Sequence, residues 1–285
     1  GDRASFVLLP SVAALRAIPH GDRSNERRPR YVAYGAPDLT PRQTAAVSAA
    51  GGEMPKGLAN PAMLRASFGP LTTAGREMQE VAQSMGVDGD AIHLDTEATE
   101  SAVRADARIS AAQIVHFATH GLLPDPTSAT PLLGEPGLVF TPPEMPTMAD
   151  DGVLSASEVS GMQLSADWLI LSACTTATAG GGDAAIGDPD SLGVLARAFL
   201  FAGAGRLLAS HWNLSAVTGR LVVARTLKDV ALDPALPPSE ALARTQRALR
   251  SGHYADGSEV FGWDREWQHP FFWAPLSIIA YDDDR

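Results

Sequence analysis

Cysteine is almost absent from this sequence, since Cys174 is the only one among 285 residues. A single cysteine excludes an internal disulfide, so the chain gains nothing from an oxidising compartment and we expect it in the cytoplasm. Long apolar runs are missing as well. The longest, residues 167–174 and 192–210, are interrupted by Asp, Arg, Gly or Ser well before the roughly 20 residues that a transmembrane helix needs. The first residues show no secretion signal, and no membrane partner is expected.

Basic residues are also scarce, because 22 Lys and Arg stand against 33 Asp and Glu, for a net charge of −11. A surface that binds nucleic acid usually shows clustered Lys and Arg, so no nucleic-acid partner is expected. Only Lys56 and Lys228 are lysine, an imbalance that indicates GC-rich coding and favours a bacterial source. What the chain does have is 45% hydrophobic residues and no tract dominated by one residue type. This composition is typical of a folded globular protein.

Short apolar runs alternate with helical patterns along the chain. The predicted strands are residues 6–9, 31–34, 91–94, 113–118, 137–140, 168–173, 206–210 and 275–281. The predicted helices are residues 74–86, 97–108, 155–161, 191–203, 215–231 and 238–251. Several strands are apolar throughout, as strands buried on both faces must be. The alternation predicts an α/β fold with a mainly parallel sheet covered on both faces, and in such sheets chemistry gathers at the carboxyl ends of the strands.

Two of the predicted strands run into residues that can do chemistry. The strand at 113–118 leads to His120 and Gly121, and the strand at 168–173 leads to Cys174. If these strands are parallel neighbours, about 4.8 Å apart, the imidazole and the thiol lie at the same edge. The imidazole can favour the thiolate or accept its proton, and the backbone amides of Gly121 and Cys174 can stabilise an oxyanion. One interpretation is therefore a His–Cys pair for acyl transfer.

Plainer interpretations of the same residues remain. A lone cysteine at the end of an apolar strand is more often a small buried hydrophobe than a nucleophile. His116 lies inside its strand and is more typical of a hydrogen-bonded core residue. His116 and His120 are four residues apart, but no cluster of Cys or carboxylates supplies further ligands, so no metal site is predicted. Two long segments, 121–152 and 175–190, look irregular, and connections of this length are often binding or gating loops.

The two strand ends together carry a family resemblance. The stretch "IVHFATHG" followed by "LILSACTT" resembles the paired signature of the CHAT domain, a bacterial branch of the caspase-like cysteine peptidases related to caspases and separase. Further stretches that resemble the family in the same order are residues 6–15, 31–39, 75–86, 151–164, 195–215 and 269–281. The resemblance implies one caspase-like domain over residues 1–285, folded as a three-layer α/β/α sandwich. It also allows this domain to come from a longer protein with amino-terminal repeats.

The resemblance also implies an activity. It makes His120 the catalytic histidine, Cys174 the nucleophile, and Gly121 an oxyanion donor together with the Cys174 amide. It implies no cofactor, a protein substrate, and in many members tetratricopeptide repeats that hold a substrate or sense a trigger. We therefore expect a regulated cysteine endopeptidase with a role in bacterial defence or programmed death. The alternative is a caspase-like interaction module without activity.

Departures from the family pattern bear on substrate preference. Thr175 stands where many relatives carry an acidic residue, and Asn213 stands where a proline is frequent. The loops after the cysteine strand and after residues 206–210 commonly shape the S1 pocket in this fold, so Trp212 is a candidate pocket wall, although a packing role is equally consistent. Three acidic residues can attract a basic P1 side chain or simply keep a loop soluble: Asp183, Asp188 and Asp190.

Overall fold

The computed structural model describes residues 7–8, 30–42, 58–87, 91–122, 134–172, 189–211 and 215–280. Its centre is a seven-stranded sheet in the order β1-β10-β9-β8-β4-β2-β3. The strands are β1 (Val7–Leu8), β2 (Tyr31–Pro37), β3 (Ile92–Asp95), β4 (Ile114–Ala118), β8 (Trp168–Leu171), β9 (Arg206–Ser210) and β10 (Leu276–Ala280). Within this sheet β9 and β10 are antiparallel and the other neighbours are parallel. The prediction of a mainly parallel sheet is confirmed.

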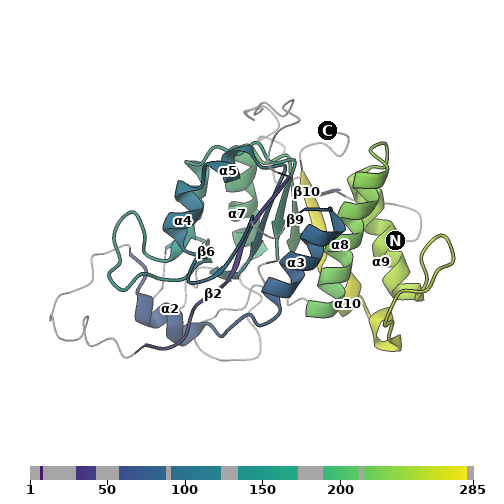
Figure 1. Cartoon of the computed structure of the whole chain (residues 1–285), viewed down its shortest axis with the longest axis horizontal. Helices are drawn as coiled ribbons and strands as arrows, with labels where there is room; N and C mark the ends of the chain where they lie inside the picture. The colour runs from purple at the N-terminus through teal and green to yellow at the C-terminus, as the bar shows by residue number, and fades with distance from the viewer. Residues whose placement is uncertain are drawn as a thin grey trace.

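Helices cover both faces of the sheet and complete a three-layer α/β/α sandwich (Figure 1). One face carries α4 (Glu100–Ala105), α5 (Ala107–Ala111), α6 (Ala156–Ser160) and α7 (Pro189–Phe201). The other carries α3 (Ala74–Ser84), α8 (Ala216–Leu232), α9 (Pro238–Ser251) and α10 (Pro270–Trp273) with the short 3-10 helix η3 (Arg265–Gln268). Among the described residues, none of the helices has both the length and the apolar composition needed to cross a bilayer.

The alternation of side chains along β4 divides them between two cores. Val115 and Phe117 belong to the core under α7, whereas Ile114 and Ala118 belong to the core under α3 and α8. All five residues of β4 are buried, so the strand needs apolar side chains on both faces. The same period of two places His116 on the α3 side of the sheet.

A smaller antiparallel sheet begins directly after β4. It contains β5 (His120–Leu122), β6 (Gly137–Val139) and β7 (Val153–Ser155) in that order. The register pairs His120 with Val139 and Gly121 with Leu138. The prediction of an irregular segment over 121–152 is wrong at β5, because a strand of three residues has no period to read in the sequence.

Some predicted boundaries also need correction. The helix predicted over 97–108 is divided into α4 and α5, because the Asp106 side chain accepts from the amide of Arg108 and caps α5. The segment predicted as irregular over 175–190 overlaps the first residues of α7, which include Asp190. Helix α9 spans the predicted residues. The sequence did not predict α2 (Pro61–Ser67), α10, η3 or β7.

Candidate active site

β4 and β8 are parallel neighbours, as the predicted His–Cys pair requires. Their register pairs Ile114 with Trp168 and Phe117 with Leu171, so the two strands end at the same edge of the sheet. His120 is the second residue after β4, and Ser172 follows β8 directly. Cys174 lies outside the described residues. The adjacency of the two strands is confirmed, whereas contact between His120 and Cys174 stays a prediction.

The His120 side chain is buried and held in one orientation. Its Nε2 atom lies 2.7 Å from the carbonyl oxygen of Gly69. Because a carbonyl oxygen only accepts, Nε2 carries the proton and donates it, and in the neutral ring the lone pair is on Nδ1. The Phe68 ring packs on the imidazole, with 4.9 Å between the ring centroids. This arrangement sets both the tautomer and the direction of the ring.

Burial also controls the charge of His120. Only 6% of the residue is exposed. Burial lowers the pKa of His120 from its ordinary value of 6.5, and the hydrogen bond to Gly69 opposes this effect in part. The imidazole is therefore neutral at neutral pH, which is the form that can accept a proton from a thiol.

Helix α2 holds the segment that supplies Phe68 and Gly69. The Asn60 side chain accepts from the amides of Ala62 and Met63 and caps the start of the helix. The buried Arg65 guanidinium donates to the backbone carbonyl oxygens of Asp38 at 2.7 Å, Thr40 at 3.3 Å and Pro142 at 2.8 Å. Below the helix, an apolar cluster joins it to the smaller sheet through Leu64, Phe68, Leu122, Val139 and Val153. The partners of His120 are thus fixed by contacts with segments that are distant in the sequence.

Sequence reasoning missed α2 and with it the environment of His120. Gly69 is 51 residues before His120, so no local spacing links them. The signal that could have revealed the helix is "NPAML" at 60–64, in which Asn60 is a good N-cap and Pro61 suits the first helical position.

His116 lies in a second buried polar cluster, on the α3 side of the sheet. Its Nδ1 atom is 2.7 Å from the hydroxyl oxygen of Tyr31. Its Nε2 atom is 3.1 Å from Ser172 Oγ and 3.4 Å from Glu77 Oε1. The prediction of a hydrogen-bonded core histidine is confirmed, because both ring nitrogens of His116 have partners among these side chains. In the described part of the chain, no group of three His, Cys, Asp or Glu side chains could hold a metal ion.

The predicted substrate-binding residues lie outside the described residues: Thr175, Asp183, Asp188, Trp212 and Asn213. His211, which the sequence analysis did not select, directly follows β9, the other neighbour of β8. Its Nε2 atom lies 2.6 Å from Ser277 Oγ, and burial lowers the pKa of His211. The same sheet edge therefore carries a second histidine.

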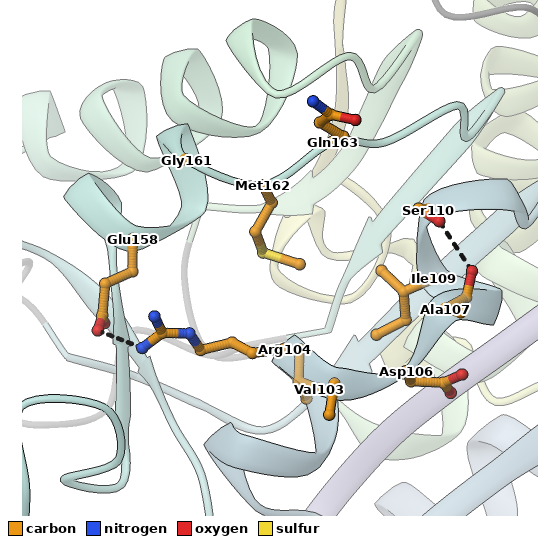
Figure 2. A pocket seen from close by; sticks show the side chains of 11 residues that line it. Val103, Arg104, Asp106, Ala107, Ile109, Ser110, Glu158, Gly161, Met162 and Gln163 are labelled. Carbon is orange, nitrogen blue, oxygen red and sulfur yellow. Dashed lines mark hydrogen bonds and ion pairs between the residues drawn. The ribbon is translucent and has the colours of Figure 1, made fainter.

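A cavity of about 430 Å³ lies elsewhere, between α4, α5 and α6 (Figure 2). Met162 projects into it, and at one end Arg104 donates to Glu158 at 2.8 Å. The cavity is near the beginning of β4, because α5 leads into that strand. His120 follows the other end of β4 and therefore lies at the opposite edge of the sheet. Among the described residues that line this cavity, none is a predicted site residue.

A comparison with known protein families shows to which family this chain belongs. The family model for the CHAT domain matches residues 1–281, almost the entire chain. Among curated proteins, none matches the chain significantly. The matched region contains both sheets, the buried His120 and the strand that leads to Cys174. The chain belongs to the CHAT domain family, which is related to the caspase-like cysteine peptidases.

Proposed function

We propose that this chain is a cysteine endopeptidase in which Cys174 is the nucleophile and His120 the general acid and base. The observation that carries the proposal is the parallel pairing of β4 with β8, because the two strands that precede His120 and Cys174 in the sequence end at one edge of the sheet. The buried, neutral His120 and the family membership support the same chemistry. The observation from the fold concerns the segments of both residues, and the observation from the side chain concerns His120.

The reaction would proceed through a thioester. The Cys174 sulfur attacks the carbonyl carbon of the scissile bond while the thiol proton passes to Nδ1 of His120. The resulting oxyanion accepts hydrogen bonds from the amides of Gly121 and Cys174. His120 then gives the proton to the leaving amine as the C–N bond breaks. Water, deprotonated by His120, attacks the thioester and releases the carboxylic acid and the free thiol.

The Gly69 carbonyl suits this cycle without an acidic third residue. When Nδ1 takes up the thiol proton, the imidazolium still donates from Nε2 to that carbonyl oxygen, 2.7 Å away. A hydrogen bond from a charged donor is stronger than the same bond from a neutral one, so this contact favours the charged intermediate state.

The remaining features of the proposal concern substrate and setting. We propose a partner protein as the substrate, cleaved in an exposed loop, with Thr175, Trp212 and Asn213 among the residues that select it. No cofactor enters the chemistry. A lone catalytic thiol suits a reducing compartment such as the cytoplasm, and the family resemblance favours bacterial defence or programmed death.

Labelling with thiol-reactive peptidyl warheads tests the proposal directly, because Cys174 is the only thiol in the chain. A library that varies the P1 residue is applied to the wild type, to His120→Ala and to Cys174→Ala as the blank. We expect labelling that depends on P1 and falls about 10²- to 10⁴-fold in His120→Ala. His253→Ala is the matched control, because His253 is exposed and follows α9.

The opposite result has a definite meaning. If the labelling rate does not depend on the P1 residue and is unchanged in His120→Ala, Cys174 is an ordinary accessible thiol. That outcome favours the alternative of an inactive interaction module.

A further inference from the structure

The buried cluster around His116 has no part in the reaction described above. It joins side chains from four segments: Tyr31 in β2, Glu77 in α3, His116 in β4 and Ser172 after β8. His116 is 0% exposed and Glu77 8%. Buried polar groups of this kind stabilise a protein only when all of them are satisfied together. The cluster therefore depends on all four side chains.

The hydrogen bonds of this cluster run in one direction. Ser172 Oγ donates its one proton to Glu77 Oε1. Toward any other partner this oxygen can therefore only accept a hydrogen bond. The contact between Ser172 Oγ and His116 Nε2 therefore needs a proton on Nε2. In the neutral ring Nδ1 then accepts from the Tyr31 hydroxyl at 2.7 Å, a much shorter contact than the 3.4 Å between that hydroxyl and the carbonyl oxygen of Met78. Burial raises the pKa of Tyr31 well above its usual value, which keeps the phenol protonated as this donor requires.

This order of hydrogen bonds shows that Ser172 is not activated as a further nucleophile. In a Ser–His–acid triad the serine donates to the histidine, and the acid bonds the other nitrogen of the ring. Here Ser172 donates to the acid, and the other nitrogen faces Tyr31. The cluster binds the serine hydroxyl and does not activate it.

What the cluster does is fix the end of β8. The backbone amide of Ser172 donates to the carbonyl oxygen of Phe117 in β4 at 3.0 Å. Its side chain is bound at the same time to Glu77 in α3 and to His116 in β4. Ser172 is two residues before Cys174 in the sequence. The last described residue before the nucleophile is therefore anchored through both its backbone and its side chain.

We propose that Ser172 and Glu77 are positioning residues, which hold the end of β8 so that the sulfur and the amide of Cys174 reach the geometry needed for attack. The inference rests on the proposed function. A displacement of about 1 Å can lower the rate of a chemical step about 10²-fold. Because neither side chain takes part in the proposed substrate contacts, their loss should slow acylation and leave substrate binding almost unchanged.

The test uses the full chain and the peptidyl warhead that labels the wild type best. The variants are Ser172→Ala, Ser172→Thr, which keeps the hydroxyl, and Glu77→Gln. The matched control is Glu80→Gln, because Glu80 lies on the same helix and pairs with Arg76 and Arg220. We expect Ser172→Ala and Glu77→Gln to lower kinact about 10- to 100-fold with KI within about 2-fold. Ser172→Thr should recover most of the rate, and Glu80→Gln should react as the wild type does.

The outcomes separate this inference from the proposed function. A wild type that reacts without P1 preference overturns the proposed function, whatever Ser172 does. A selective wild type with unchanged kinact in Ser172→Ala and Glu77→Gln overturns the positioning role alone. A rise in KI at constant kinact does the same, because it indicates a role in substrate binding.

A spectroscopic measurement on the wild type tests the same inference without any variant, in case the variants fail to fold. The ¹⁵N resonances of the histidine rings in the wild type distinguish the two neutral tautomers. We expect the Nε2–H tautomer at His116, as the direction of the hydrogen bonds requires. An Nδ1–H tautomer would contradict the order of bonds on which the inference depends.

Discussion

The chemistry available to His120 depends on two residues that are distant in the sequence. Phe68 covers the ring and the Gly69 carbonyl binds Nε2. The strand predicted over 113–118 located His120 just beyond β4, which ends at Ala118. Its tautomer and its lowered pKa could not be predicted, because both result from a segment that packs against it through tertiary contacts. The sequence therefore identified the candidate but not the environment that prepares it.

Phe68→Ala should shift the pH profile of the proposed activity. Neutral His120 is the reactive form, so the rate falls as the pH drops through its pKa, which burial holds below 6.5. Removing the Phe68 ring lets water reach the imidazole, weakens this effect, and moves the pKa upward toward 6.5. The midpoint of the acid limb of kinact/KI should therefore rise.

The control for this shift is Phe261→Ala, because Phe261 is 93% exposed. Its acid limb should coincide with that of the wild type. A limb that is unchanged or moves to lower pH in Phe68→Ala would show that Phe68 does not set the charge of His120.

At the scale of helices and strands, sequence patterns succeeded for a long helix and for central strands with an apolar middle. β9 and α9 have their predicted bounds, and β4 and β8 are neighbours as assumed. α2 has seven residues and β5 has three, too few for a period to stand out. β5 contains His120, and α2 leads into Phe68 and Gly69, which contact its ring. The parts of the site that sequence reasoning missed are thus the parts formed by short elements.

The contact between β2 and β4 allows a direct test at this scale. A Cβ atom on Gly35 would lie 2.3 Å from the carbonyl oxygen of Ala118 and 2.8 Å from Met78 Cε. Gly35→Ala should therefore lower the free energy of unfolding by about 1–3 kcal/mol, because the backbone of β4 has to move. Urea denaturation measures this change.

Gly193→Ala is the matched control for Gly35→Ala. Gly193 lies inside α7, and an added Cβ would meet its closest neighbour at an ordinary 3.5 Å. Alanine favours a helix, so this variant should be as stable as the wild type or up to about 1 kcal/mol more stable. Equal destabilisation of both variants would contradict the steric explanation.

At the scale of the molecule, the central sheet links its two large cores. β4 contributes Val115 to the core under α7 and Ile114 to the core under α3 and α8. β8 divides its side chains in the same way. If β4 or β8 left one core, the apolar side chains that the strand contributes to the other core would be exposed as well. We therefore propose that the two faces of the sheet fold together as one domain.

One domain predicts one cooperative unfolding transition. Phe199→Ala removes a buried ring from the α7 side and should cost about 3–5 kcal/mol, whereas Met78→Ala on the α3 side should cost about 2–5 kcal/mol. Each variant should shift the denaturation curves from far-UV circular dichroism and from tryptophan fluorescence by the same amount. Met145→Ala, at a residue that is 67% exposed, should change the free energy of unfolding by less than about 0.5 kcal/mol. If either core variant shifted one denaturation curve and not the other, the two faces of the sheet would unfold separately. The proposed active site, at the edge of that sheet, would then not depend on both cores.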